Sequence, residues 1–157
     1  MRPDDPAVRE ILRRSMVARL ATVSRNGRPN LNPLYFVLRD DRIWLGTVDA
    51  SLAARNVKAD PRVAVLFTPE HDGPGAPLVR VTGTATVRTD RAVTRAYLRA
   101  DARKYVLTPG GLANFFSHPR QARHMPTYLG SGDKGHSCVI EVVPVHAEFV
   151  APPRQPA

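Results

Sequence analysis

The feature that most constrains the fold is a pair of extended segments joined by a short, glycine-containing turn. Residues 17–24 are small and β-branched, residues 29–38 form a second extended run, and Asn26-Gly27 lies between them. Asn-Gly in this setting is the strongest short hairpin signal, because both central residues of a type I′ turn need a positive φ. The sequence therefore predicts an antiparallel hairpin with a type I′ turn at Asn26-Gly27.

The rest of the chain combines further strand patterns with short helical ones. A second tight turn at Asp40-Asp41 leads into the remaining predicted strands, which are 43–47, 62–68, 78–88 and 138–150. The predicted helices are 6–16, 49–60 and about 90–105. Because βαβ alternation is absent, we expect an α+β fold with six mostly antiparallel strands and two to three peripheral helices. The sheet is expected to curl into a barrel, which removes exposed edges.

Length and composition favour one domain. A chain of 157 residues can bury one core, so we expect a single domain over residues 1–150 and a disordered tail over 151–157. No apolar run approaches the roughly 20 residues that span a bilayer, and residues 1–14 are charged where a signal peptide is apolar. We therefore expect a soluble, cytoplasmic protein. The single cysteine, Cys138, excludes an internal disulfide and is expected in the core.

The net charge of +9 raises the question of nucleic-acid binding, because clustered cations attract phosphate backbones. Most of the arginines are scattered among acidic residues. The exception is a stripe at every fourth position of one predicted helix, formed by Arg91, Arg95, Arg99 and Arg103. The complementary apolar face consists of Val93, Ala96, Tyr97 and Ala100. This pattern favours the solvated face of an amphipathic helix over a stripe that binds phosphates.

Three motifs do not support the chemistry that they suggest. Residues 130–135 match the dinucleotide pattern G-x-G-x-x-G, but they precede a strand instead of opening a helix, so a loop is favoured. His118 and His124 lack the spacing and the third ligand of a helical zinc site, so no metal site is predicted. The serine, aspartate and histidine within 131–136 do not make a credible triad, and no G-x-S-x-G elbow occurs. No catalytic residue is therefore predicted.

The corner from Thr47 to Asn56 gathers several requirements of anion binding. Thr47 ends a strand, Ser51 or Asp49 caps a helix, and Arg55 lies one turn after Ser51. Free amides at a helix start, two hydroxyl groups and a guanidinium can converge on one anion. The carboxylate of Asp49 opposes this unless it faces away. From these residues alone, an ordinary capped connector helix is favoured over an anion site.

Several segments occur in a characteristic order and spacing. They are Leu20–Pro29, Pro33–Leu38, Ile43–Thr47, Ser51, Arg55-Asn56 and Asp60–Phe67. Together they resemble the pyridoxamine 5′-phosphate oxidase-like split-barrel family, and the likeness covers residues 10–88 and the final strand. The resemblance implies a homodimeric split barrel with FMN, or the deazaflavin F420, at the subunit interface. The residues that it assigns to the cofactor are Asn32, Pro33, Leu34, Tyr35, Gly46, Thr47, Ser51 and Arg55.

The resemblance places the backbone of residues 32–35 along the ring system, and Thr47, Ser51 and the following helix at the phosphate. The chain departs from the family pattern after the serine, where Leu52 and Ala53 stand at positions that are usually basic. A cation there is worth about 1.5–3 kcal/mol as a charge-assisted bond, so its loss weakens the cofactor assignment. Arg55 and an arginine of the partner subunit are the two candidates to compensate for it. The Arg-rich C-terminal motif of true pyridoxamine phosphate oxidases is missing, so oxidation of vitamin B6 is not predicted.

Three functions follow in order of preference. The first is an oxidoreductase that transfers hydride between FMN or F420 and a small molecule, whose binding place is expected beneath the loop at 108–134. The second is a non-enzymatic protein that binds a cofactor, haem or another ligand. The third, least favoured, is a nucleic-acid-binding protein that uses the arginine stripe.

Overall fold

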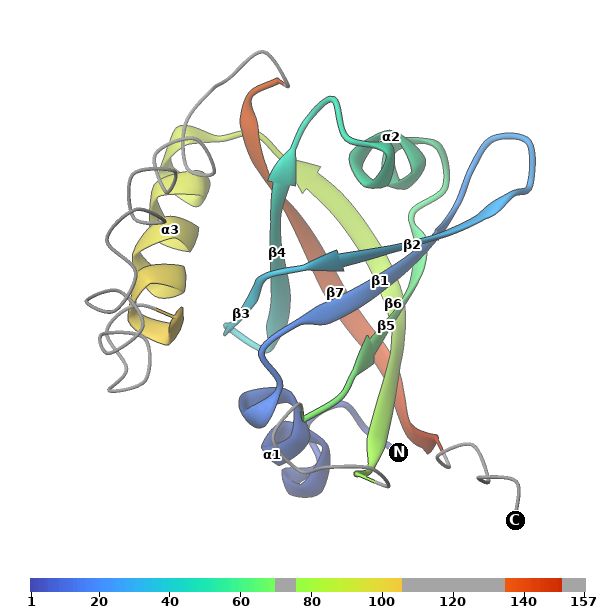
Figure 1. The fold of residues 1–157 in the computed structure, drawn as a ribbon, viewed down its shortest axis with the longest axis vertical. Helices are drawn as coiled ribbons and strands as arrows, with labels where there is room; N and C mark the ends of the chain where they lie inside the picture. The colour runs from blue at the N-terminus through green and yellow to red at the C-terminus, as the bar shows by residue number, and fades with distance from the viewer. Residues whose placement is uncertain (70–75, 106–134, 151–157) are drawn as a thin grey trace, which may run out of the picture.

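The computed structural model describes residues 1–69, 76–105 and 135–150. The helices are α1 (Pro6–Arg14), α2 (Leu52–Ala59) and α3 (Arg91–Tyr105). The strands are β1 (Ala18–Val23), β2 (Pro29–Leu34), β3 (Phe36–Arg39), β4 (Arg42–Val48), β5 (Arg62–Phe67), β6 (Leu78–Arg88) and β7 (Ser137–Val150). Apart from the run at 29–38, which forms two strands, the predicted elements are confirmed in order and type within these ranges (Figure 1). The expected loop at 108–134 and the expected tail at 151–157 lie outside the described residues.

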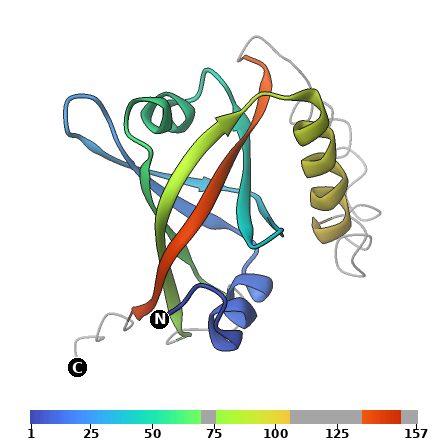
Figure 2. The same cartoon turned by 180° about the vertical axis from the view of Figure 1, so that it is seen from behind.

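All seven strands form one antiparallel sheet in the order β2-β1-β5-β6-β7-β4-β3. The sheet curls so that β2, at one edge, crosses toward β4 near the other edge (Figures 1 and 2). We call the region where the end of β2 meets β4 the seam. There the Gly46 amide donates a hydrogen bond to the Tyr35 carbonyl at 3.1 Å. The expected α+β split barrel is therefore confirmed.

The expected strand count of six is wrong, because the run at 29–38 is two strands. The β1 strand begins at Ala18, which pairs with Leu34, so residues after Leu34 have no partner in β1. From Phe36 onward the chain pairs instead with β4, beginning with Leu45. Tyr35 is the point of transfer between the two ladders. The single extended run at 29–38 therefore forms both β2 and β3, which are the two edge strands of the sheet.

The type I′ turn forms at the second hairpin and not at the first. Asp40 and Asp41 have φ values of 50° and 57°, and they join β3 to β4 directly. Of the pair Asn26-Gly27, only Gly27 has a positive φ, of 77°. The Ser24 side chain bonds to Asn26 and accepts from the Arg28 amide at 3.1 Å, which stabilises a wider loop. Aspartate tolerates the left-handed region better than most residues, which permits the turn at 40–41.

Two apolar clusters cover the two faces of the sheet. The inner cluster fills the barrel, and α1 and α2 close it with Val8, Ile11, Ala53 and Val57. The outer cluster lies beneath α3 and consists of Val37, Trp44, Tyr97 and Val139, with Val93, Ala96, Leu98 and Ala100 packed against it. The predicted buried face of this helix is thus confirmed. Cys138 is also buried as expected, with 2% of its surface exposed.

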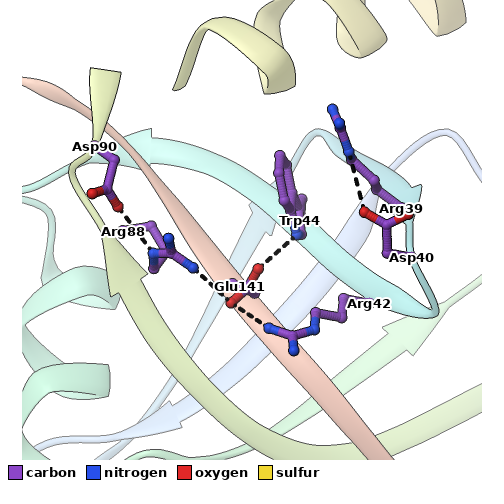
Figure 3. Close-up of polar contacts among 7 residues, drawn as sticks. All are labelled: Arg39, Asp40, Arg42, Trp44, Arg88, Asp90 and Glu141. Carbon is purple, nitrogen blue, oxygen red and sulfur yellow. Dashed lines mark hydrogen bonds and ion pairs between the residues drawn. The ribbon is translucent and has the colours of Figure 1, made fainter. Parts of the chain in front are cut away.

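A buried carboxylate joins three strands on the outer face. Glu141, in β7, is 6% exposed and accepts a hydrogen bond from the Trp44 indole of β4 at 3.1 Å. It also pairs with Arg42 at 2.7 Å and with Arg88 of β6 at 3.1 Å (Figure 3). Because each of its neighbours is a donor, the carboxylate is satisfied despite its burial. The network fixes β4, β7 and β6 against one another beside α3.

Candidate functional site

The corner after β4 has the form of an open helix start. Ser51 is the N-cap of α2, and its Oγ accepts from the Ala54 amide at 3.1 Å. The Ser51 amide donates to the Val48 carbonyl at 3.0 Å, which tightens the turn. The amides of Leu52 and Ala53 have no acceptor within the helix, because the first turn of any helix lacks them. A helix start of this kind is a common binding place for an anion.

Asp49 does not face the start of α2. Its Oδ1 accepts from the His136 amide at 2.9 Å, and its own amide donates to the His136 carbonyl at 2.9 Å. These two bonds tie the corner to the residues that precede β7. Gly135 makes the approach possible, because its φ is +108° and a Cβ would lie 2.5 Å from Asp49 Oδ1. The carboxylate of Asp49 is therefore bonded to His136, and Ser51 is the cap.

Arg55 and Asn56 have different roles. Asn56 is 3% exposed, and its Nδ2 donates to Thr22 Oγ1 of β1 at 3.0 Å, which anchors α2 on the barrel. Arg55 is exposed, and its guanidinium has no ion pair or hydrogen bond within the described parts of the chain. An unpaired guanidinium one turn after an open helix start can bind an anion there.

The two positions after Ser51 also differ. Ala53 is 1% exposed and belongs to the inner cluster, so a long basic side chain does not fit there without disrupting the core. Leu52 is 41% exposed, so its position has room for one. The departure from the family pattern at Ala53 therefore has a packing reason, whereas nothing in the structure explains the one at Leu52.

The residues of β2 that the sequence assigned to the ring system meet β4 at the seam. Asn32 pairs with Leu20 of β1, so its side chain is on the barrel side of the sheet, and its Oδ1 is buried without a hydrogen-bond partner among the described residues. Tyr35 is 59% exposed, and its ring lies 4.8 Å from that of Tyr105. A buried amide oxygen without a partner costs free energy, which a ligand donor at this position would recover.

Gly46 lies at the same seam, and α3 explains why it is a glycine. A Cβ at this position would lie 2.5 Å from Cζ of Tyr97, whose ring is 6% exposed. The Tyr97 hydroxyl donates to Asp101 Oδ1 at 2.9 Å and lies 3.3 Å from the Tyr35 carbonyl oxygen. Burial and the charge of Asp101 raise the pKa of Tyr97, and burial raises the pKa of Asp101. The sequence identified Tyr97 only as part of a buried face and gave no signal for Asp101.

Tyr105 holds the seam from the end of α3. Its hydroxyl lies 2.7 Å from the Met16 carbonyl oxygen and 2.9 Å from that of Phe36, and it accepts from the Phe36 amide at 3.2 Å. Lys104 adds a hydrogen bond to the Phe36 carbonyl at 3.3 Å. These contacts fix the backbone where β2 gives way to β3. Sequence spacing alone could not reveal them, because they depend on where α3 docks.

Cys138 faces Thr47 across the ladder between β4 and β7. Burial, followed by the charge of Asp49, raises the pKa of its thiol to about 11. The thiol is therefore protonated at neutral pH and is a poor nucleophile. This agrees with the expectation that the cysteine belongs to the core.

The predictions about metal sites, membrane spans and the motifs near 118–136 can be compared with the described residues only. Within 1–69, 76–105 and 135–150, no group of three side chains has the arrangement of a metal site, and no helix is long and apolar enough to cross a membrane. His118 and His124 lie outside the described residues, as do all of 130–135 except Gly135. The two surface grooves described below are lined by other residues than Thr47, Ser51 and Arg55.

Comparison with known proteins identifies the sequence pattern. Residues 4–150 match the family model described as pyridoxamine 5′-phosphate oxidase. No curated protein matches the chain. Among solved structures, the conserved hypothetical protein Rv2991 from Mycobacterium tuberculosis has a TM-score of 0.69 and 18% identity, and the alignment covers 94% of this chain and 84% of that one.

Two further structures carry functional names. An F420 reductase has a TM-score of 0.61 and 21% identity, with 88% of this chain and 94% of that one covered. The haem storage protein HutZ from Vibrio cholerae has a TM-score of 0.59 and 14% identity, with 97% and 96% covered. At these identities the likeness shows a shared fold.

Proposed function

Because the chain belongs to the pyridoxamine 5′-phosphate oxidase family, we propose that it is an oxidoreductase that binds FMN or F420 at the corner after β4. The observation that carries the proposal is that Arg55, one helical turn after the N-cap Ser51 of α2, is exposed and has no ion pair or hydrogen bond within the described residues. The corner offers helix amides, the hydroxyls of Thr47 and Ser51, and this one cation to a phosphate. The F420 reductase of the same fold supports the deazaflavin as well as the flavin.

The residues of the seam fit the rest of the cofactor. Asn32 presents a buried oxygen that has no donor among the described residues, and Pro33 of β2 and Tyr35, which follows β2, are exposed. Leu34 and Gly46 complete the expected contact between β2, β4 and the ring system. When bound, the cofactor supplies the hydride chemistry, and the protein binds it, orients it and excludes water. No described side chain is assigned the role of acid or base.

The sheet has an exposed surface that a second copy of the chain can cover. The outer face of β1, β2 and β7 carries exposed apolar side chains, which include Val23, Leu31 and Val145. Val23 and Val145 line one open groove there with Val63. An exposed apolar face of this kind marks an interaction surface. We infer a homodimer that holds the cofactor between subunits and acts on a small molecule in the cytoplasm.

A non-enzymatic ligand-binding protein is the second candidate. It is favoured by the absence of a cation at positions 52 and 53, which weakens phosphate binding, and by the similar fold of a haem storage protein. The nucleic-acid alternative requires affinity that falls steeply with ionic strength, because phosphate contacts release counterions.

Titration of the purified protein with FMN and with F420, followed by absorbance, tests the proposal. Arg55→Ala should weaken binding of the phosphate-bearing cofactor by about 1.5–3 kcal/mol, because one charge-assisted bond is lost. Lys58→Ala, on the exposed side of the same helix, is the matched control and should change affinity little. If neither cofactor binds below roughly 100 μM, the oxidoreductase proposal fails. Binding of haem alone would favour the second candidate.

A further inference from the structure

A groove beside α3 collects cations from three separate elements. It has a volume of about 730 Å³ and is lined by residues of α3, β3 and α1. Figure 1 shows where these three elements lie. The cations that line it are Arg13 of α1, Arg39 of β3, and Arg99, Arg103 and Lys104 of α3. No acidic residue of the described chain lines it. The volume lies within the range of small-molecule sites.

The floor of this groove is aliphatic. Leu12, Val37, Leu38, Ala96 and Ala100 supply it, from the same three elements. On α3 the lining residues recur at positions 96, 99–100 and 103–104, so the helix turns a single face to the groove. A surface that combines an apolar floor with a cationic rim is complementary to an amphipathic anion.

The cations of the rim differ in the ion pairs and hydrogen bonds that they already form. Arg99 and Arg103 are exposed and form no ion pair or hydrogen bond within the residues that the structure describes. Arg13 pairs with Glu10 at 2.8 Å, through side chains that are both largely exposed. Lys104 lies against the Phe36 ring and carbonyl. Among these cations, Arg99 and Arg103 are therefore the two that are not already bonded to another described residue.

Arg39 is also partly engaged. It lies 3.4 Å from Asp40 and stacks on the Trp44 ring, 5.2 Å from its centroid (Figure 3). Stacking leaves the edge of a planar guanidinium able to donate hydrogen bonds. This arginine therefore extends the rim on the side opposite α3.

The groove divides the arginine stripe of α3 into two functional halves. Arg99 and Arg103 line the groove, whereas Arg91 and Arg95 do not. A helix face that tracks a nucleic-acid backbone would use all four and would gain nothing from an aliphatic floor. Residues four apart on a helix are about 6 Å apart, so Arg99 and Arg103 can share one carboxylate.

We propose that this groove binds a medium-chain alkyl carboxylate, with the head group between Arg99 and Arg103 and the chain along the floor. The head group receives charge-assisted hydrogen bonds, and the methylene groups displace water from Leu12, Val37 and Leu38. The proposal does not depend on the cofactor corner, because the groove contains none of its residues.

Calorimetric titration of the full chain with decanoate tests the site. The double variant R99Q/R103Q should lose at least about tenfold in affinity for decanoate, because both arginines of the head-group site become neutral. The double variant R91Q/R95Q removes the same charge from the same helix and should change the affinity less than about twofold. Equal losses in the two variants would show general surface attraction and would overturn the proposal.

Ligand controls separate the head group from the chain. Decanol, which keeps the chain, and acetate, which keeps the head group, should each bind at least about tenfold more weakly than decanoate. Decanol binding as tightly as decanoate, or an absence of saturable decanoate binding, would refute the site. FMN and F420 titrations of R99Q/R103Q should match those of the unchanged protein, so failure of the corner and failure of the groove are distinguishable.

Discussion

Gly46→Ala should destabilise the protein because the added methyl group takes space that Tyr97 occupies. The new Cβ would lie 2.5–2.6 Å from three atoms of the Tyr97 ring. The ring cannot move freely, since it is buried between Trp44 and Val139 and its hydroxyl is bonded to Asp101. Overpacking of this kind costs about 1–3 kcal/mol, and loss of the hydroxyl bond adds about 1 kcal/mol. We therefore expect a loss of about 2–4 kcal/mol.

The same substitution should change sign when Tyr97 is removed. Tyr97→Ala alone should cost about 3–5 kcal/mol through the cavity that it leaves. In that background Gly46→Ala meets no ring, and it should be neutral or stabilising by up to about 1 kcal/mol, because alanine restricts the unfolded chain. Urea unfolding of the four proteins measures the coupling as a double-mutant cycle. Additive losses in the cycle would refute the assignment of Gly46 to the packing of α3.

Three further predictions concern the polar contacts. Tyr105→Phe should cost about 1–2 kcal/mol in urea unfolding, because the hydroxyl lies within hydrogen-bond distance of the Met16 carbonyl, before β1, and the Phe36 carbonyl of β3. Glu141→Gln should lower the free energy of unfolding by about 1–3 kcal/mol, because the arginines and the Trp44 indole then face a neutral acceptor instead of a carboxylate. The apolar core stays intact in this variant, and an unchanged urea midpoint would contradict the prediction. The Arg62 side chain lowers the pKa of Asp60 from 3.8 to about 2 through a hydrogen bond. The stabilisation from this depressed pKa is present above pH 4 and is lost as the pH falls toward 2, so Arg62→Gln should move the NMR titration of Asp60 back toward its ordinary pKa.

The elements that are local in sequence could be predicted, and those that depend on distant partners could not. The spacing of apolar residues located α1 and α2, and the β6 strand has the expected bounds of 78–88. The break between β2 and β3 at Tyr35 could not be predicted in the same way, because it depends on where the pairing between β1 and β2 ends. Likewise the choice of turn at 26–27 depends on bonds from the Ser24 side chain.

The candidate site shows the same division. The capping role of Ser51 follows from local chemistry, and the structure resolves the ambiguity between it and Asp49. The engagement of Asp49 with His136 joins residues 87 apart in the chain, and no local pattern indicates it. The groove beside α3 likewise requires three elements to meet. The arginine stripe could be predicted from the sequence, but not that only Arg99 and Arg103 of the stripe line a groove.

The position of β7 between β4 and β6 also determines how the sheet can assemble. The hairpin of β3 and β4 can form early, but its neighbour in the sheet arrives much later in the chain, since Arg42 and Glu141 are 99 residues apart. Closing so long a loop costs chain entropy before any of the pairing is gained, which slows folding. Until β7 inserts, β4 keeps an open edge that can pair with another chain. The rate-limiting step of folding should therefore be the insertion of this one strand, and the species that precedes it should be the one most prone to aggregate.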